Sequence, residues 1–220
     1  MWRLKMFLMQ IVRALRKRQD NKKAVRIARH WIALVNSVPN RQEKVLLHIG
    51  CGDIDATGYI NIDARPQPHI HIVSKSLFRL TEIPDNVADM IYMCHVLEHV
   101  SHREIVPTLR EMHRILKAGG VLRISVPDFE KVIEIYNASG RDIGSIQGPL
   151  MGGQDYAFNY HYTAFNESHL RRSLEKSGFS QSLTWDPFNC EHHDFDDWAS
   201  RNISWEGREF PISLNIEAVK

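Results

Sequence analysis

The amino-acid sequence predicts an α/β fold with a mostly parallel sheet, and three observations support that prediction. The apolar run at residues 45–49 is continuous, as in a strand covered on both faces. Strand-like and helix-like segments then alternate, which is the pattern of a parallel sheet. After the last expected helix, two more strand-like segments, at 181–185 and 212–219, are typical of an antiparallel pair at a sheet edge.

The stretch around which the domain is organised is residues 44–63, KVLLHIGCGDIDATGYINID. The first strand runs into Gly50, Cys51 and Gly52, where the backbone can come close to a ligand. A second strand, 59–63, ends in Asp63, whose carboxylate can accept hydrogen bonds from the two hydroxyls of a ribose. Because ligands of open α/β sheets bind at this end of the strands, the two segments predict a nucleoside pocket.

The middle of the chain continues the alternation. The expected elements are strands at 70–73, 88–94 and 121–126, and helices at 101–117 and from 128 to about 138. Ser101 and Glu104 should form a capping box at the start of the first helix, and Asp128 should cap the second.

Residues 139–166 lose periodicity and gather Gly, Pro, Asn and Tyr, after which a helix is expected from about 168 to 176. A loop this long is more often a lid or binding loop than filler. It combines flat rings with hydrogen-bonding groups, at Gln154, Tyr156, Tyr160, His161 and Tyr162. Stacking of these rings on a sugar and packing of the loop on its own aromatics are equally consistent with this pattern.

The composition is that of an ordinary soluble domain, with 43% hydrophobic and 25% charged residues among 220. Cys51, Cys94 and Cys190 lie far apart without a CxxC spacing, so neither a disulfide framework nor a structural zinc site is expected. No apolar run approaches the roughly 18 to 20 residues of a membrane span, and no signal peptide is recognisable. We therefore expect a cytoplasmic protein.

The basic charge lies in an N-terminal extension. Residues 1–44 carry 12 Lys and Arg against two acids, a net charge of +10, whereas the remaining 16 basic and 24 acidic residues give −8. Two helical stretches are expected before Pro39, the first with an apolar face formed by Leu4, Leu8, Ile11 and Leu15. We expect residues 1–40 to form the extension and residues 41–220 the α/β domain.

Three interpretations of the extension remain open. It can pack on its own domain or on a partner subunit, or it can lie on anionic lipid at the inner face of a membrane. Nucleic acid is the least favoured partner and is not expected, because no aromatic and basic interleaving supports it.

Four motifs in order, HIGCGD, GYINID, HVLEHV and KAGGVLRISVPD, resemble the class I S-adenosylmethionine-dependent methyltransferases. They look most like a small branch, type 11, that is frequent among polysaccharide and lipopolysaccharide biosynthesis proteins. The resemblance covers roughly residues 44–180. It implies a Rossmann-like, three-layer α/β/α fold with a seven-stranded, mostly parallel sheet whose last strand is antiparallel, and S-adenosyl-L-methionine as the cofactor.

The resemblance also implies roles for site residues. Gly50, Cys51 and Gly52 would face the methionine part of the cofactor and Asp63 its ribose. The segment with Cys94, His95 and Glu98 would lie beneath the transferred methyl group. A nicotinamide dinucleotide fits less well, because the third glycine of GxGxxG is missing and Asp63 follows the turn too closely.

Two departures from the family pattern stand out. Six residues separate Gly52 from Tyr59, too few for the usual helix after the first strand, so a loop must replace it and the pocket should be more open. The branch usually carries an acid near the end of the third strand to bind the adenine amine, but this chain has Ser74, Lys75 and Ser76 there.

Methyl transfer from a sulfonium chiefly requires alignment of acceptor and methyl group, so few catalytic residues are needed. His95 follows the fourth strand, beside the expected methyl position, and either assists transfer or shapes the loop by hydrogen bonding. His161 is the acceptor-side candidate, because the family resemblance also places a histidine there.

A metal site is not expected. His95 and His99 flank Glu98, but HVLEH is not the HExxH zinc arrangement and no third ligand stands at a familiar spacing. The polar cluster at 191–194, EHHD, is expected to be solvated surface.

These patterns predict an S-adenosylmethionine-dependent methyltransferase that acts on a glycan, a glycan precursor or a related small hydroxyl or amine acceptor. The alternative is a non-catalytic subunit with a methyltransferase fold and an assembly or regulatory role.

Overall fold

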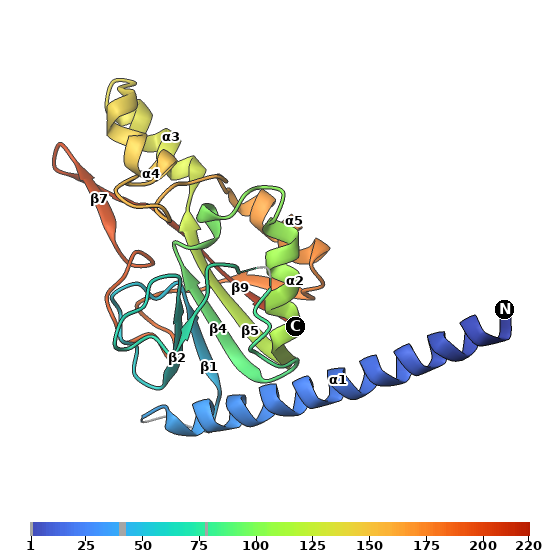
Figure 1. The fold of residues 1–220 in the computed structure, drawn as a ribbon. Helices are drawn as coiled ribbons and strands as arrows, with labels where there is room; N and C mark the ends of the chain where they lie inside the picture. Colours follow the sequence, from blue (N-terminus) through green and yellow to red (C-terminus); the bar gives the residue numbers. More distant parts are fainter. Residues whose placement is uncertain (1, 40–42, 78) are drawn as a thin grey trace.

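The chain is built around one seven-stranded sheet (Figure 1). The computed structural model describes residues 2–39, 43–77 and 79–220, with side chains from residue 20 onward. The strands of the sheet are β1 (Leu46–Ile49), β2 (Tyr59–Asp63), β3 (Ile72–Val73), β4 (Ala88–Cys94), β5 (Leu116–Pro127), β6 (Gln181–Thr184) and β9 (Ser213–Val219). The helices are α1 (Trp2–Ser37), α2 (Ile105–Ile115), α3 (Phe129–Ala138), α4 (Gln147–Met151) and α5 (Glu167–Lys176), with short 3₁₀ helices η1 (Leu97–His99) and η2 (Ile143–Ile146).

The strand order is β3-β2-β1-β4-β5-β9-β6. β1 pairs in parallel with both β2 and β4, and β4 pairs in parallel with β5. β9 is antiparallel to both of its neighbours, β5 and β6. The predicted Rossmann-like sheet is therefore confirmed, including its late antiparallel strand. The order reverses between β1 and β4, and at such a point the loops that follow the two strands separate and leave a crevice.

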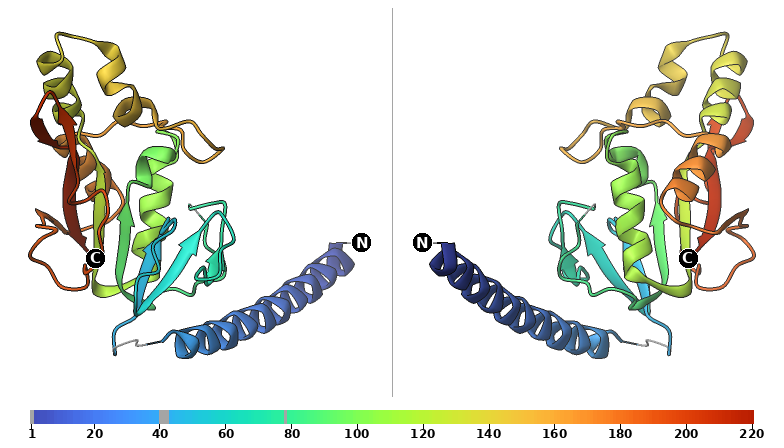
Figure 2. Two further views of the ribbon diagram at one scale, coloured as in Figure 1. Left: turned by 90° about the vertical axis from the view of Figure 1, so that its left-hand side faces the viewer. Right: turned by 90° about the vertical axis from the view of Figure 1, so that its right-hand side faces the viewer.

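The two faces of the sheet are covered differently. On one face, apolar strand residues pack against α2 and α5, as Ile91 and Ile124 do in the cluster that contains Leu109 and Leu170. On the other face, Tyr59 and Tyr92 belong to a cluster with Trp185, from the segment after β6. The side views show the helices and this orange loop on opposite sides of the sheet (Figure 2). The third layer is thus a loop, in keeping with the chain being too short for a helix between β1 and β2.

Of the two predicted helix caps, that of α3 is confirmed and that of α2 is wrong. Asp128 is the N-cap of α3, and its side chain accepts a hydrogen bond from the Glu130 N–H. The capping box at α2 is wrong, because Glu104 itself is the N-cap and its side chain makes no capping bond. The Glu104 N–H instead donates to the Ser101 carbonyl at 2.7 Å, which forms a turn and delays the helix to Ile105.

The segment 139–166 is less irregular than predicted, because η2 and α4 lie within it. Asp142 caps η2 through its side chain, and Ile146 packs against Ile135 and Phe210. A hairpin of β7 (Asn202–Trp205) and β8 (Arg208–Pro211) was not predicted. Its two-residue turn has both residues at positive φ, so the glycine between two strand-like runs was an available signal.

The N-terminal extension is one continuous helix rather than two. In α1, Trp31 is buried in the main core, as is Val38 directly after the helix, whereas Val25 and Ile32 are more than half exposed. The apolar face expected at Leu4, Leu8, Ile11 and Leu15 involves side chains outside the described ones. Across the described residues, no helix has an apolar stretch long enough to cross a bilayer.

Candidate functional site

The glycine turn after β1 is held in a conformation that only glycine adopts easily. Gly50 has φ +68° and its N–H donates to the Ile62 carbonyl at 2.7 Å, which ties the turn to β2. A Cβ at this position would lie 2.3 Å from Cγ2 of Val96, which is an impossible contact. The turn therefore brings bare backbone to the carboxyl ends of β1 and β4.

Asp63, at the end of β2, holds the same turn through its side chain. Its carboxylate accepts hydrogen bonds from the Gly52 N–H at 3.0 Å and from the Arg65 N–H at 2.8 Å. The Arg65 guanidinium lies 3.6 Å from the same carboxylate. The side chain is nearly buried but borders the crevice, so the turn and the acid form one unit.

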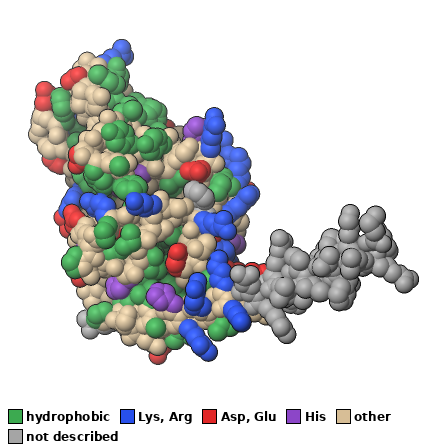
Figure 3. Space-filling view, viewed as in Figure 1, with side chains coloured by type: hydrophobic (Ala, Val, Ile, Leu, Met, Phe, Trp, Pro, Cys, Tyr) green, Lys and Arg blue, Asp and Glu red, His purple; other side chains and the backbone are tan. Residues whose placement is uncertain are grey.

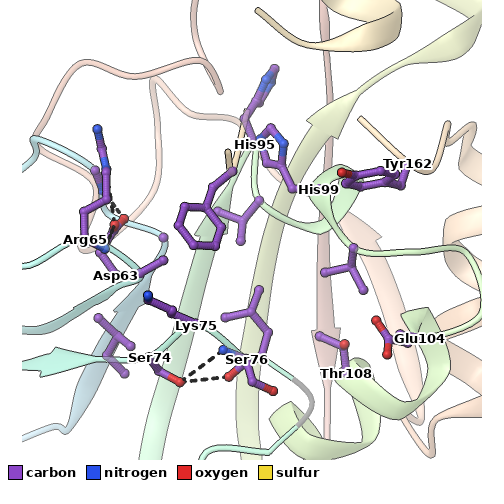
Figure 4. Close-up of a pocket in the computed structure, with 18 of the residues that line it drawn as sticks. Asp63, Arg65, Ser74, Lys75, Ser76, His95, His99, Glu104, Thr108 and Tyr162 are labelled. Carbon is purple, nitrogen blue, oxygen red and sulfur yellow. Dashed lines mark hydrogen bonds and ion pairs between the residues drawn. The ribbon is translucent and has the colours of Figure 1, made fainter. Parts of the chain in front are cut away.

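A first cavity of about 350 Å³ opens in front of this unit (Figure 4). The turn and Asp63 border it on one side, and the start of α2 borders it on the other. Aromatic side chains of the long loop also line it, at Tyr156, Phe158 and Tyr162. The cavity therefore lies at the carboxyl ends of β1, β2 and β4, as the sequence predicts for a nucleoside pocket.

The segment after β3 supplies hydroxyls and a cation to this cavity instead of an acid. Ser74 Oγ donates to the Ser76 carbonyl at 2.9 Å, so its hydroxyl is engaged within the segment, and Lys75 also lines the cavity. A carboxylate comes from elsewhere, because Glu104 borders the cavity from the turn before α2 (Figure 4). Beside it, Thr108 Oγ1 is buried without a hydrogen-bond partner among the described residues. Sequence reasoning assigned Glu104 to a helix cap and missed this position.

A second cavity of about 670 Å³ adjoins the first. The two share six lining residues, Gly50, Gly52, Arg65, His95, His99 and Tyr156. The second cavity is otherwise lined by the segment around α4 and by the loop that follows β6. Polar and aromatic groups face it together, including Asn159, Asp196, Trp198 and Arg201. The cavities therefore meet at the glycine turn and at the histidines that follow β4.

His95 occupies this junction in a strained conformation, with φ +51°. The Ser213 hydroxyl donates to the Trp198 carbonyl at 2.6 Å, so His95 Nε2–H must be the donor in the 2.8 Å bond to Ser213 Oγ. The Nδ1 atom of His95 is left with a lone pair, and its ring stacks on Trp198 with 5.7 Å between centroids. Burial, with a smaller effect of His161, lowers the pKa of His95 to about 3, so the ring is neutral near pH 7.

Glu98 lies one turn further on, in η1, and is 1% exposed. Its carboxylate Oε1 is 3.5 Å from His95 Nδ1 and 3.9 Å from His161 Nε2. Burial raises the pKa of this carboxyl to about 8. The Glu98 carbonyl accepts hydrogen bonds from the N–H groups of Tyr162 and Thr163, at 2.8 and 3.2 Å, which attach the long loop to η1.

His99 and His161 complete the histidine group, with 4.9 Å between ring centroids. His161 Nδ1 lies 3.0 Å from the Pro149 carbonyl, and His99 Nδ1 lies 3.1 Å from the Tyr160 carbonyl. Burial, followed by the proximity of His99, lowers the pKa of His161 to about 4. Burial also lowers the pKa of His99.

The structure brings most of the predicted site residues together. Gly50, Gly52 and His95 border both cavities and Asp63 borders the first, whereas Cys51 and Cys94 border only the second. Burial raises the pKa of the Cys51 thiol to about 12 and that of Cys94 well above its usual value, so neither cysteine is an activated nucleophile. Glu98 borders neither cavity but lies 3.5 Å from His95, and His161, which borders only the second cavity, lies 3.9 Å from Glu98.

The cluster at 191–194, which was expected to be solvated surface, is solvated only in part, because Glu191 and Asp194 are exposed but His193 is not. The side chain of His193 is 3% exposed, and its Nε2 lies 3.3 Å from Asp197 Oδ1. The Tyr92 hydroxyl donates to the same Asp197 carboxylate at 2.5 Å. Hydrogen bonds from His193 and Tyr92 outweigh burial and leave the pKa of Asp197 below its usual value. This buried acid anchors the loop that lines the second cavity.

The match to a known family falls on this part of the chain. A protein-family model described as a methyltransferase domain matches residues 53–124, which contain Asp63, the strand β4, the histidines after it and α2. The matched segment is about a third of the 220 residues, so the chain resembles this family over that part. S-adenosyl-L-methionine is the methyl donor of the family. The chain shows no significant sequence match to a curated protein.

A solved structure with a TM-score above 0.5 supports the fold assignment, and two further structures with lower scores are similar. A SAM-dependent methyltransferase from Archaeoglobus fulgidus superimposes with a TM-score of 0.51 at 16% identity, over 90% of this chain and 94% of that one. A chain from the complex between a Haloferax volcanii methyltransferase and the activator Trm112 gives 0.49 at 14% identity, over 91% and 94%. A SAM-dependent methyltransferase from Thermotoga maritima gives 0.49 at 16% identity, over 92% and 95%.

Proposed function

We propose that the protein methylates a hydroxyl of a glycan or glycan precursor, with S-adenosylmethionine in the first cavity and the acceptor in the second. The observation that carries this proposal is the junction of the cavities at Gly50, Gly52 and His95. A donor and an acceptor bound on the two sides of this junction would meet there. Holding two reactants in line can itself lower the barrier substantially, and an already activated methyl group needs little other assistance.

On the cofactor side, the N–H groups of the glycine turn would bind the methionine carboxylate, as consecutive backbone amides bind anions. The carboxylate of Asp63 would accept the ribose hydroxyls. The Glu104 carboxylate and the Thr108 hydroxyl would accept hydrogen bonds from the adenine amine, in place of the acid that is missing after β3. Glu98 and Cys94 would lie beneath and beside the methyl group, and Cys51 would only separate the two cavities.

On the acceptor side, the second cavity offers the groups that carbohydrate recognition uses. Asn159, Asp196 and Arg201 present hydrogen-bonding groups, and Trp198 presents a ring that is 43% exposed. A sugar has hydroxyls at its edge and apolar C–H groups on its faces, so it needs both kinds of contact. The same surface would bind a small amine only through its carboxylates, Asp196 and Asp197.

In the reaction, an acceptor oxygen lone pair forms the new bond to the methyl carbon while the carbon–sulfur bond breaks. The electron pair of that bond stays on sulfur, which gives S-adenosylhomocysteine, and the acceptor proton leaves to a base or to water. With a pKa of about 3, His95 is too weak a base to take that proton fully. We propose that its Nδ1 lone pair orients the hydroxyl, with His161 contacting the acceptor from the other side.

The acceptor class can be tested by supplying ¹³C-methyl S-adenosylmethionine with a panel of saccharides, nucleotide sugars and small amines. We expect NMR of the product to show a labelled methyl ether on a saccharide. Labelling of amines alone would contradict the glycan proposal while leaving methyltransferase activity intact.

We propose further that residues 1–40 are a basic extension to the domain at 41–220 and contact anionic lipid at an inner membrane face. Lys22, Lys23, Arg26 and Arg29 are exposed on α1. More Lys and Arg side chains lie along the side of the domain that α1 adjoins (Figure 3).

Sedimentation with anionic vesicles tests the lipid contact. Each basic residue near such a surface contributes about 1 kcal/mol, so the double variant Arg26→Glu/Arg29→Glu should bind at least about 30-fold more weakly. These substitutions spare Trp31, which is buried in the core and which a deletion of the extension would remove. Unchanged sedimentation would support subunit packing through α1 instead.

A further inference from the structure

Three potential metal ligands converge next to the junction of the cavities, where His99 borders both cavities and His161 borders the second. One ligand atom each from Glu98, His99 and His161 lies within 4.8 Å of the others. Glu98 and His99 come from η1, whereas His161 comes from the long loop, more than 60 residues later. The loop is fixed to η1 by the hydrogen bonds of Tyr162 and Thr163 to the Glu98 carbonyl. The convergence is therefore built into the backbone.

The Glu98 carboxyl lacks the partners that a buried acid normally has. It is 1% exposed, and neither of its oxygens has a hydrogen-bond partner within residues 2–39, 43–77 and 79–220. The atom that faces it most closely, His95 Nδ1 at 3.5 Å, carries a lone pair because His95 Nε2–H is committed to Ser213. A buried carboxylate beside another electron pair is strongly unfavourable unless a proton or a cation lies between them.

Both remaining histidines are prepared for metal binding. A carbonyl oxygen only accepts hydrogen bonds, so the contacts with Pro149 and Tyr160 place a proton on Nδ1 of His161 and of His99. The Nε2 atom of each neutral ring then has a free lone pair. Histidine ligands of metals typically donate their second ring N–H to a carbonyl or carboxylate in this way, which fixes both the tautomer and the ring orientation.

The distances suit one ion after small side-chain rotations. Ligand atoms about 2.1 Å from one tetrahedral Zn²⁺ lie about 3.4 Å apart. The 3.9 Å separation between Glu98 Oε1 and His161 Nε2 must shorten by about half an ångström. The ligand atoms of the trio lie within 4.8 Å of one another, so the widest pair must close by about 1.4 Å at most, which rotation of the side chains can supply.

We propose that Glu98, His99 and His161 bind one divalent transition-metal ion, preferentially Zn²⁺, next to the junction of the two cavities. Two imidazoles and one carboxylate are typical ligands of Zn²⁺ and related ions, whereas Mg²⁺ and Ca²⁺ prefer oxygen ligands alone. Three protein ligands leave a coordination position open, which is the arrangement of a catalytic rather than a structural site. His99 borders both cavities and His161 borders the second, so the ion would lie next to the space assigned to the reactants.

The role of this ion rests on the proposed function, although its binding does not. An acceptor hydroxyl coordinated at the open position would lose its proton more easily, because a bound cation lowers the pKa of a coordinated oxygen group. This would compensate for the weak basicity of His95. Spacing in the sequence does not reveal the site, because its third ligand, His161, is supplied by a distant loop.

The test is metal binding by the full chain after treatment with a chelator. Co²⁺ titration followed by visible absorption, and Zn²⁺ titration followed by elemental analysis, should each give one ion per chain. Glu98→Gln keeps the side-chain shape but removes the charge, and should weaken binding by at least about 100-fold, more than the loss of an outer-shell partner. If Glu98→Gln fails to fold, His161→Gln should weaken metal binding by the same factor.

Two control variants separate this site from other histidines. His102→Ala changes an exposed residue near η1, and His192→Ala changes the loop cluster; both should retain full metal binding. Absence of binding to the wild-type chain, or equal binding by Glu98→Gln, would overturn the proposal. S-adenosylhomocysteine should be titrated into the same samples, because its failure to bind while the ion binds would contradict the proposed function and support the metal site.

Discussion

The two sides of the proposed active site are built differently. On the side proposed for the cofactor, strand ends and the short turns after them hold Gly50 and Asp63 by hydrogen bonds between β1 and β2, and the start of α2 and the long loop complete the cavity. The side proposed for the acceptor consists mainly of side chains carried by long connections, such as Trp198 after β6 and His161 after α4. One side depends on backbone geometry, and the other depends on packing between segments that are distant in sequence.

This difference predicts different responses to mutation. A change in the turn should alter cofactor binding directly, because the backbone itself forms the binding surface. A change in the acceptor loops should leave cofactor affinity intact and alter stability or acceptor use instead. The predictions below test that division, beginning with the largest expected effect.

Gly50→Ala should nearly abolish cofactor binding. A Cβ would overlap Val96, and the left-handed conformation costs an L-residue about 1–2 kcal/mol in addition. We expect calorimetry with S-adenosylhomocysteine to show at least a 100-fold loss of affinity, where ~1.4 kcal/mol corresponds to tenfold.

Gly119→Ala is the matched control for this effect. Gly119 also has a left-handed φ, +75°, but an added Cβ would meet nothing within 4 Å. It should lose about 1–2 kcal/mol of unfolding free energy and keep full cofactor affinity. Equal losses of affinity in both variants would mean that general destabilisation, and not the local overlap, is responsible.

Asp63→Asn should weaken S-adenosylhomocysteine binding by about 10- to 100-fold, the range expected for lost hydrogen bonds to a charged group. The substitution preserves the shape of the side chain, and its amide oxygen can still accept the hydrogen bond from the Gly52 N–H. Asp53→Asn, one residue after Gly52 and largely exposed, is the control and should bind normally. Normal binding by Asp63→Asn would exclude the carboxylate from ribose recognition.

The sequence predicted the geometry of the glycine turn and of Asp63 well because its determinants are local. A continuous apolar strand, a glycine turn and an acid at the end of the next strand specify one geometry at one sheet edge. The helix α3 and its Asp128 cap were predictable for the same reason.

The acceptor side could not be predicted, because its residues meet only after the chain has folded. Asp197 lies in an irregular loop, and nothing local reveals that Tyr92 and His193 bind its carboxylate. Glu98 and His161 are likewise brought together by loop contacts rather than by spacing. The hairpin of β7 and β8 was also missed, but it could have been predicted, because a glycine between two strand-like runs indicates a tight turn.

Asp197→Asn should destabilise the acceptor side without affecting the cofactor. The buried carboxylate accepts hydrogen bonds from Tyr92, His193 and the Ala199 N–H, so we expect a loss of about 1–3 kcal/mol in unfolding free energy. Denaturant unfolding measures the loss, and Asp196→Asn, at an exposed neighbour, should show no measurable change.

The effect of Asp197→Asn should also depend on pH. A carboxyl whose pKa is lower in the folded state contributes stability above its unfolded pKa, and this contribution is lost as pH falls through the folded pKa. The difference between wild type and Asp197→Asn should therefore be full at pH 7 and shrink below about pH 4. A difference that stays constant down to pH 2 would show that the charge is not what stabilises the loop.

Trp198→Ala should have the smallest effect on the cofactor, less than twofold in S-adenosylhomocysteine affinity. The ring borders the second cavity and stacks on His95, so the variant should instead raise the KM for the acceptor. A large loss of cofactor affinity would show that the two sides are not separate.

The most direct test of the account is a crystal structure with S-adenosylhomocysteine bound. We expect the ribose hydroxyls on the Asp63 carboxylate, the homocysteine carboxylate on the glycine turn, and the sulfur directed toward His95 with the second cavity left free. A ligand seated in the second cavity, or one that makes no contact with Asp63, would contradict the assignment of the two sides.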